Sequence, residues 1–250
     1  MNTPLEKEIA FFDLDHTVLP YDTQALFAHF VMQRYPLRRL YLFIYLPSLL
    51  LFAIKLISLK TMKRVFSCYL YRMPAYQLNE LAKEFAETIV PLVAYPDVVA
   101  EIKRHRKEGR TLILNSASPE FYLQHISAHF GFDHYIGTNM VIEKSMPLIP
   151  RLIGPNNKKA EKITAMQKRE LLPEEFESPL AGCWSYSDSS ADIPLLSIAE
   201  HGVTIHPKKH LLSAAKQHGW AVTHPVQPYS GKWGGRLASL KQALGIGKFW

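Results

Sequence analysis

Three short apolar runs, each followed by polar side chains, constrain the fold of this chain more than any other feature. Residues 9–12 lead into Asp13, residues 111–114 lead into Ser116, and a third run ends at Asp188. Runs of this length and composition are typical of parallel strands buried on both faces. Open α/β sheets gather their functional side chains at the carboxyl ends of such strands, so we expect these polar residues to meet at one edge.

Helical patterns alternate with these runs along the chain. Residues 97–105, 193–201 and 211–218 have helical character, and residues 203–205 and 221–223 are further short apolar runs. Alternation of strand and helix is typical of parallel sheets covered by helices. We therefore predict an α/β fold with a doubly wound, Rossmann-like and mostly parallel sheet.

Composition divides the chain into three parts. Residues 1–21 and 95–224 carry the alternating pattern and are predicted to form the core domain. Residues 22–94 show no clear strand alternation and are predicted to be an inserted α-helical domain, called the insert below. Residues 225–250 are a basic, aromatic extension in which residues 236–244 have the pattern of one short helix. A chain of 250 residues with 48% hydrophobic content is long enough for this arrangement.

The net charge of +7 is concentrated in two segments. Residues 23–79 contain eight basic and no acidic residues, and residues 226–250 contain four basic and no acidic residues. All 22 acidic residues lie elsewhere, so the remaining body is mildly acidic. Localised basic segments of this kind indicate an anionic partner or surface. The basic residues are Arg34, Arg38, Arg39, Lys55, Lys60, Lys63, Arg64 and Arg72 in the first segment and Lys232, Arg236, Lys241 and Lys248 in the second.

Two features bear on the cellular compartment. Residues 1–9 contain no apolar core of the length found in secretory signal peptides. Cys68 and Cys183 are too few for a disulfide framework and indicate free thiols in a reducing compartment. We expect a cytoplasmic protein, with the option of attachment to the cytoplasmic face of the inner membrane.

The first motif, Asp13-Leu14-Asp15, places two carboxylates close together at the end of a strand. Like charges about 4 Å apart repel by roughly 4 kcal/mol at an effective dielectric constant near 20, so a cation or a shifted pKa is expected. Mg²⁺ prefers such oxygen ligands together with phosphate and water. Alone, the pair also fits a solvated acidic turn or the metal site of some glycosyltransferases.

Three further motifs are individually weak. Ser116 could bind phosphate or could simply form a turn. Lys158 and Lys159 open a predicted helix and could neutralise phosphate charge, although lysine pairs are commonly solvated. Asp188 and Asp192 lie four residues apart and would share one face of a turn, where a carboxylate can also serve as a helix N-cap.

The order of these motifs resembles the haloacid dehalogenase superfamily, in particular its phosphoserine-phosphatase-like branch, subfamily IB. The resemblance rests on Phe-Asp-Leu-Asp-His-Thr at residues 12–17 and Tyr-Ser-Asp-Ser-Ser-Ala-Asp-Ile-Pro-Leu-Leu at residues 186–196. It covers residues 8–20 and 92–224. Members often have glycine before the fourth-motif aspartate, where this chain has Ser187, a minor departure.

The resemblance implies a role for each motif residue. Asp13 would be the nucleophile that forms an aspartyl-phosphate, and Asp15 would act first as general acid and then as general base. Catalysis would also need Ser116 and a lysine. Phosphate would be bound by Leu14, Asp15, Ser116, Ala117 and Lys159. Mg²⁺ would be held by Asp13, the Asp15 carbonyl, Asp188 and Asp192, the last in or just behind the first ligand shell.

The motif lysine is assigned by spacing. Lys159 is favoured over Lys158 because Ile163 follows it by four residues, which places both on one helix face. Lys158 remains the alternative.

The insert contains a long apolar segment, residues 40–59, with Lys55 as its single charge. Its length would permit a transmembrane helix, but both ends of the insert must return to the core and basic residues flank both sides. Pro47 predicts two short helices meeting at a bend. We expect a hairpin or amphipathic helix in the cytoplasmic leaflet, supported by Trp233, Phe249 and Trp250 in the extension. The alternative is a buried helical core of the insert.

The insert resembles that of the bacterial phosphatidylglycerophosphatase C family, including Arg-Tyr-Pro-Leu at residues 34–37. This resemblance implies hydrolysis of a lipid-borne phosphomonoester, plausibly phosphatidylglycerophosphate, at a membrane surface. The alternatives are a soluble small-molecule phosphatase with a phosphoserine-like substrate and, from another class, a non-catalytic membrane-surface binding protein. We expect no nucleic acid partner, because basic charge alone would not call for a twenty-residue apolar run. The sequence makes no prediction of oligomeric state.

Overall fold

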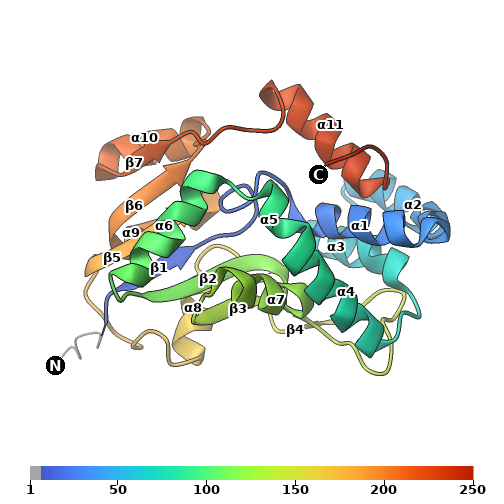
Figure 1. The fold of residues 1–250 in the computed structure, drawn as a ribbon, viewed down its shortest axis with the longest axis horizontal. Helices are drawn as coiled ribbons and strands as arrows, with labels where there is room; N and C mark the ends of the chain where they lie inside the picture. Colours follow the sequence, from blue (N-terminus) through green and yellow to red (C-terminus); the bar gives the residue numbers. More distant parts are fainter. Residues whose placement is uncertain (1–6, 250) are drawn as a thin grey trace.

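The computed structural model describes residues 7–249 and contains a seven-stranded sheet flanked by helices (Figure 1). Residues 1–6 of the predicted core and Trp250 of the predicted aromatic tail lie outside the described residues. The strands are β1 (Ile9–Phe12), β2 (Thr111–Pro119), β3 (His134–Met140), β4 (Leu152–Ile153), β5 (Leu180–Ser187), β6 (Ala199–Ile205) and β7 (Ala221–Thr223). Their order in the sheet is β4-β3-β2-β1-β5-β6-β7.

Every neighbouring pair of strands is parallel except β3 and β4, which are antiparallel. The predicted doubly wound, mostly parallel α/β sheet is therefore confirmed. The buried strand β1 lies at its centre, where Phe12 is level with Leu114 of β2 and with Tyr186 of β5. This register brings the residues that follow these strands to the same edge of the sheet.

The helices of the insert precede β2. They are α1 (Thr23–Arg34), the 3₁₀ turn η1 (Pro36–Tyr41), α2 (Leu42–Ala53), α3 (Leu59–Phe66), η2 (Ser67–Leu70), α4 (Ala75–Thr88) and α5 (Val90–Val93). The later helices are α6 (Pro96–Lys107), α7 (Glu120–Phe130), α8 (Glu161–Lys168), η3 (Ser190–Asp192), α9 (Ile193–Ser197), α10 (Lys209–His218) and α11 (Gly231–Ala243).

Two sequence predictions about helices were wrong. The helix expected over residues 193–201 ends at Ser197, because the chain from Ala199 onward pairs with β5 as strand β6. The two short helices expected on either side of Pro47 are one, because α2 runs through this residue. Most side chains of α2 are exposed, which leaves room for the proline ring and lets water bond the carbonyl that a proline leaves unpaired. The chain turns instead after α2, where Lys55 has a positive φ, and α3 packs back against α2.

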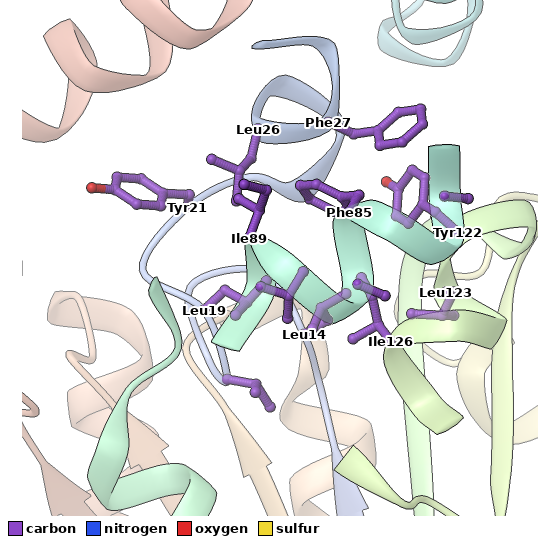
Figure 2. Packing of buried hydrophobic residues seen from close by; sticks show 14 of the residues in the cluster. Leu14, Leu19, Tyr21, Leu26, Phe27, Phe85, Ile89, Tyr122, Leu123 and Ile126 are labelled. Atoms are coloured by element: carbon purple, nitrogen blue, oxygen red, sulfur yellow. The ribbon is translucent and has the colours of Figure 1, made fainter. Parts of the chain in front are cut away.

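One hydrophobic core joins the insert to the sheet. Phe27 of α1 and Phe85 of α4 are fully buried and pack edge to face, with ring centroids 5.2 Å apart. Tyr122 of α7 packs beside Phe27, and Leu14 from the loop after β1 belongs to the same cluster (Figure 2). Burying side chains of this size contributes roughly 1.5–3 kcal/mol each. The boundaries given above for core, insert and extension remain a proposal.

A buried hydrogen-bonded chain ties α6 to β5. Nδ1 of His105 lies 3.1 Å from the Arg110 guanidinium, and its Nε2 lies 2.8 Å from the Tyr186 hydroxyl and 3.1 Å from the Arg104 guanidinium. The Tyr186 hydroxyl in turn donates to Glu101 over 2.7 Å. Burial, assisted by nearby arginine side chains, lowers the pKa of His105 to about 4, so its ring is neutral at pH 7. This network of hydrogen bonds fixes Tyr186. The backbone carbonyl of Tyr186 accepts a hydrogen bond from the Asp13 amide over 3.0 Å.

The shared core gives a stability prediction. Phe85→Ala should lower the free energy of unfolding by about 3–5 kcal/mol, because it removes a fully buried ring from the contact between α1, α4 and α7. Phe43→Ala is the matched control, since Phe43 is 71% exposed, and should change stability by less than about 0.5 kcal/mol. Urea unfolding followed by circular dichroism measures both. Equal losses in the two variants would contradict a core shared between insert and sheet.

Candidate active site

A buried lysine links two aspartates at the carboxyl edge of the sheet. Asp13 follows β1, and its Oδ1 is 2.7 Å from Nζ of Lys162. The same Nζ lies 2.8 Å from Oδ2 of Asp192, which also accepts a hydrogen bond from Ser187 over 2.8 Å. All four side chains are buried. The sheet register and α8 therefore converge on one small charged cluster.

The lysine that contacts Asp13 is Lys162, not the predicted Lys159 or its alternative Lys158. Lys158 and Lys159 are exposed, and Lys159 lies in a left-handed turn before α8 begins at Glu161. Lys162 is on the inward face of α8 together with the fully buried Met166, four residues on. The same four-residue spacing would have found Lys162, had the helix start been placed correctly.

Asn157, the first residue of the predicted third motif, has a structural part in the site. Its Nδ2 donates to Oδ1 of Asn115 and to the carbonyl of Ser116, each over 2.8 Å, and more weakly to the carbonyl of Ile136. These bonds tie the loop before α8 to the ends of β2 and β3. Asn157 thereby fixes the backbone around Ser116.

Crowding of carboxylates controls the electrostatics of the site. Burial raises the pKa of Asp13 to about 8; Lys162 opposes this shift, and the neighbouring aspartates, including Asp188 and Asp192, add to it. Burial also raises the pKa of Asp188 to about 6, against the influence of His16 and a nearby lysine. Although burial alone would lower it, the pKa of Lys162 is raised to about 12 by its two carboxylate partners. Lys162 therefore compensates only part of the negative charge around Asp13.

Asp15 lies at the junction between core and insert. Its Oδ1 accepts hydrogen bonds from the backbone amide of Thr23, over 2.9 Å, and from the Thr23 hydroxyl, over 2.5 Å. Its Oδ2 accepts from the hydroxyl of Ser118 over 3.0 Å. Burial and the neighbouring Asp22 raise the pKa of Asp15. The first helix of the insert thus holds the second aspartate of the first motif.

Thr23, Ser118 and Thr17 were missed by the sequence analysis. Ser118 follows Ser116 by two residues, so the period of a strand could have placed both on one face. Thr17 donates to Asp13 over 3.4 Å and accepts the Asp188 amide over 3.0 Å, which bridges the first and fourth motifs. No sequence signal singles out Thr23 beyond its place at the start of α1.

The predicted phosphate-binding residues surround the same edge. Ser116 is buried in β2, one residue beyond the position level with Asp13, and its Oγ accepts the amide of Ser118 over 3.2 Å. The Ala117 carbonyl accepts the hydroxyl of Thr138 over 2.9 Å. The carbonyl of Leu14 accepts three backbone amides from the turn that follows β1. Their contact with phosphate stays a prediction.

The acidic residues fit Mg²⁺ in their chemistry. Within residues 7–249, no group of three or more His, Cys, Asp or Glu side chains has the arrangement of a complete metal site. Mg²⁺, however, commonly takes only one or two carboxylates and completes its shell with water and substrate phosphate. The charge of Asp188 helps to raise the pKa of Asp13, and a divalent cation bound by both carboxylates would favour their ionised forms. Asp192 faces Lys162 and fits a place behind that shell.

The sequence pattern of the haloacid dehalogenase-like hydrolases matches residues 10–197, from β1 through the fourth motif to the end of α9. The chain belongs to this family. The match includes the acidic motif, Ser116, Lys162 and the Asp188–Asp192 turn in one continuous region. The family, fold and enzyme class expected from the sequence, a haloacid dehalogenase-type phosphatase, are thereby confirmed, whereas the roles of single residues are not tested.

Individual relatives of this haloacid dehalogenase-like hydrolase are distant. It is 25% identical over 232 residues to the inhibition of morphological differentiation protein of Streptomyces azureus, a match covering 88% of this chain and 79% of that protein. A probable phosphatase of Mycobacterium tuberculosis is 28% identical over 160 residues, which cover 62% of this chain and 52% of that protein. A protein of unknown function from Bordetella pertussis Tohama I has a similar fold, with a TM-score of 0.70 and 21% identity over 88% of this chain and 98% of its own.

The buried cluster gives a prediction that separates the two candidate lysines. Lys162→Met should lower the hydrolysis rate of p-nitrophenyl phosphate by about 100-fold or more, because it removes the positive charge beside Asp13. Lys159→Met should leave the rate within about twofold, since Lys159 is exposed. Thermal unfolding of both variants must show that they are folded at the assay temperature. A folded Lys162→Met protein with the wild-type rate would contradict this assignment.

Proposed function

We propose that this hydrolase is a Mg²⁺-dependent phosphomonoesterase that works through an aspartyl-phosphate on Asp13 and acts on a lipid-borne phosphate such as phosphatidylglycerophosphate. The observation that carries the chemical part is the Asp13–Lys162–Asp192 cluster at the sheet edge. The observation that carries the lipid part is the exposed apolar surface of α2.

In the proposed first step, Oδ2 of Asp13 attacks phosphorus and the bond from phosphorus to the leaving oxygen breaks. Lys162 bonds Oδ1 and so orients the carboxylate with Oδ2 toward the substrate. Asp15 gives its proton to the leaving oxygen; its raised pKa favours the protonated form that a general acid needs. Bound Mg²⁺ would neutralise charge on the phosphoryl group and on the carboxylates of Asp13 and Asp188.

In the second step, Asp15 takes a proton from water, whose oxygen attacks the phosphorus of the aspartyl-phosphate. The bond between phosphorus and Asp13 breaks, inorganic phosphate leaves, and Asp13 is regenerated. Thr23 and Ser118 hold the Asp15 carboxylate in place for both proton transfers. Because Thr23 begins α1, the insert takes part in positioning the acid and base.

The apolar segment of the insert is exposed rather than buried. Phe43 is 71% and Leu50 is 65% exposed, and only Leu42 and Ser48 of α2 are buried. The segment Pro36–Ala53 has the length and mean hydropathy, 1.3, of a membrane-crossing helix, with 11% of it buried. The alternative of a buried helical core for residues 40–59 does not agree with this exposure. An unpartnered apolar helix of this kind supports contact with a membrane.

The geometry of α2 favours one leaflet over a complete crossing. Its 12 residues extend over about 18 Å, less than the roughly 30 Å of a bilayer core, and α3 packs back against it. Lys55 and Lys60, just beyond the helix, are exposed and suited to anionic headgroups. Arg38 and Arg39 instead donate hydrogen bonds within the protein. Arg38 donates to the carbonyl of Tyr69, and Arg39 donates to the carbonyl of Gly245.

Two alternatives make different predictions. A soluble phosphatase of phosphoserine-like substrates would turn over its substrate without membrane contact. A non-catalytic membrane-surface protein would bind vesicles without releasing phosphate. The intact charged cluster around Asp13 favours an enzyme over the second alternative, and the exposed α2 favours a lipid substrate over the first.

The covalent step can be tested directly. Asp13→Asn should lower phosphate release on the order of 10⁴-fold or more and should abolish radioactive labelling of the protein by a ³²P-phosphomonoester, because the attacking oxygen is lost. Asp97→Asn, at an exposed position in α6, is the matched control and should retain wild-type labelling and rate. Removal of divalent cations with EDTA should stop turnover by the wild-type protein until Mg²⁺ is restored. Retained labelling of the Asp13→Asn protein would refute the nucleophile.

The membrane contact can be tested separately from the chemistry. The double variant Phe43→Glu/Leu50→Glu should lose flotation with vesicles of phosphatidylglycerol and phosphatidylethanolamine and should lose most hydrolysis of phosphatidylglycerophosphate in them. Its rate with p-nitrophenyl phosphate should remain within about twofold, because charged residues on α2 disturb only the lipid contact. Leu92→Glu, at a 68% exposed position on α5, is the control. Unchanged flotation and lipid turnover by the double variant would contradict a membrane role for α2.

A further inference from the structure

A cavity of about 760 Å³ opens beside Asp188 at the carboxyl edge of the sheet. One wall is the motif region, with His16 and Asp188, and a second wall is the loop after β6, residues 206–209. The third wall is the extension, which crosses from the end of β7 to α1 and carries α11 (Figure 1). The volume is that of a site for a small ligand rather than for a few waters.

The extension is fixed against both the core and the insert. The Tyr229 hydroxyl donates to the carbonyl of Pro20 over 2.8 Å, and Nδ1 of His16 lies 3.1 Å from the same carbonyl. A carbonyl only accepts, so Nδ1 of His16 carries the proton. At the far end of α11, the Gly245 carbonyl accepts hydrogen bonds from Gln33 and Arg39. The cavity wall is therefore built into the fold.

Tyr229 packs closely on the first turn of α11. A Cβ atom at Gly235 would lie 3.0 Å from the Tyr229 ring, so glycine permits this approach. Gly231 and Gly235 both line the cavity. The amino-terminal end of a helix carries partial positive charge, which adds to the charge of the surrounding side chains.

The charged residues that line the cavity are mostly cations. Lys208, Lys209 and Arg236 contribute fixed positive charges, and Asp188 is the single acidic residue among the lining residues. Lys208 and Asp188 line the same cavity, which places this ammonium group on the side of the proposed reaction centre. The guanidinium of Arg236 stacks on the Trp233 ring, 5.1 Å from its centroid, and is exposed. An anionic group entering the cavity would meet both cations.

A second cavity near the predicted phosphate-binding residues is small. The cavity between α3 and the ends of β2, β3 and β4 measures about 20 Å³ and is lined by Lys63, Arg64 and Ala117 among others. A space of this size holds about one water molecule. Of these two cavities, the one beside Asp188 has the volume for the leaving group of a substrate.

We propose that the extension forms a second wall of the active site and that the cavity binds the leaving group of the substrate through a second anionic group, held by Lys208 and Arg236. The inference rests on the proposed function and specifies its substrate class. A lipid with a phosphodiester next to the scissile phosphomonoester, as in phosphatidylglycerophosphate, has the required second charge. Phosphatidic acid has the phosphomonoester alone.

The test compares these two lipids in the same detergent micelles. Arg236→Gln and Lys208→Gln should each lower the ratio of kcat/KM for phosphatidylglycerophosphate to kcat/KM for phosphatidic acid about tenfold or more, mainly through KM, because each variant removes a charged contact. Lys241→Gln, an exposed lysine of α11 outside the cavity lining, is the matched control and should leave the ratio unchanged. An unchanged ratio in both cavity variants would overturn the inference.

The outcome can be separated from the fate of the proposed function. If the wild-type protein hydrolyses p-nitrophenyl phosphate but neither lipid, the lipid assignment fails. In that case the ratio of kcat/KM for fructose 1,6-bisphosphate to kcat/KM for fructose 6-phosphate is measured instead. A loss of preference for the bisphosphate in the cavity variants would support the second anionic site for a soluble substrate. No preference in the wild-type protein for either doubly charged substrate would overturn it.

Discussion

The ammonium group of Lys162 between Asp13 and Asp192 is the interaction on which the rest of the site depends. It joins the end of β1, the inward face of α8 and the turn after β5 at a single buried point. Breaking a buried pair by removing one partner typically costs 3–5 kcal/mol, because an uncompensated charge stays behind. The carboxylates can therefore lie together at the sheet edge because Lys162 compensates part of their charge. The negative charge that remains favours the binding of a divalent cation.

A second constraint links the chemistry to the insert. Asp15 is held by Thr23, the first residue of α1, and by Ser118 of β2, so its carboxylate is bonded to insert and core together. The continuous hydrophobic core around Phe27 and Phe85 keeps α1 in that place. The insert thus positions Asp15 through α1, and it exposes apolar side chains to solvent on α2.

The sequence predicted the parts of the site that depend on strands. The run before Asp13 is apolar on both faces, and parallel pairing leaves few choices for where its next residue lies, so the sheet edge could be predicted. The place of Lys162 in the site could not be predicted, because the direction of a helical side chain depends on where the helix starts. Here α8 begins only at Glu161, after a left-handed turn at Lys159. The docking of Tyr229 on Pro20, across 209 residues of sequence, leaves no local pattern to read.

The bonds at the two ends of the extension bear on how the site opens. The extension is bonded to the core at Pro20 and to the insert at Gln33 and Arg39, so separating insert and core on this side requires one of these two sets of bonds to break. The tail of the chain therefore couples the insert to the core beside the cavity, and any motion that moves them apart there must first release one end of the extension.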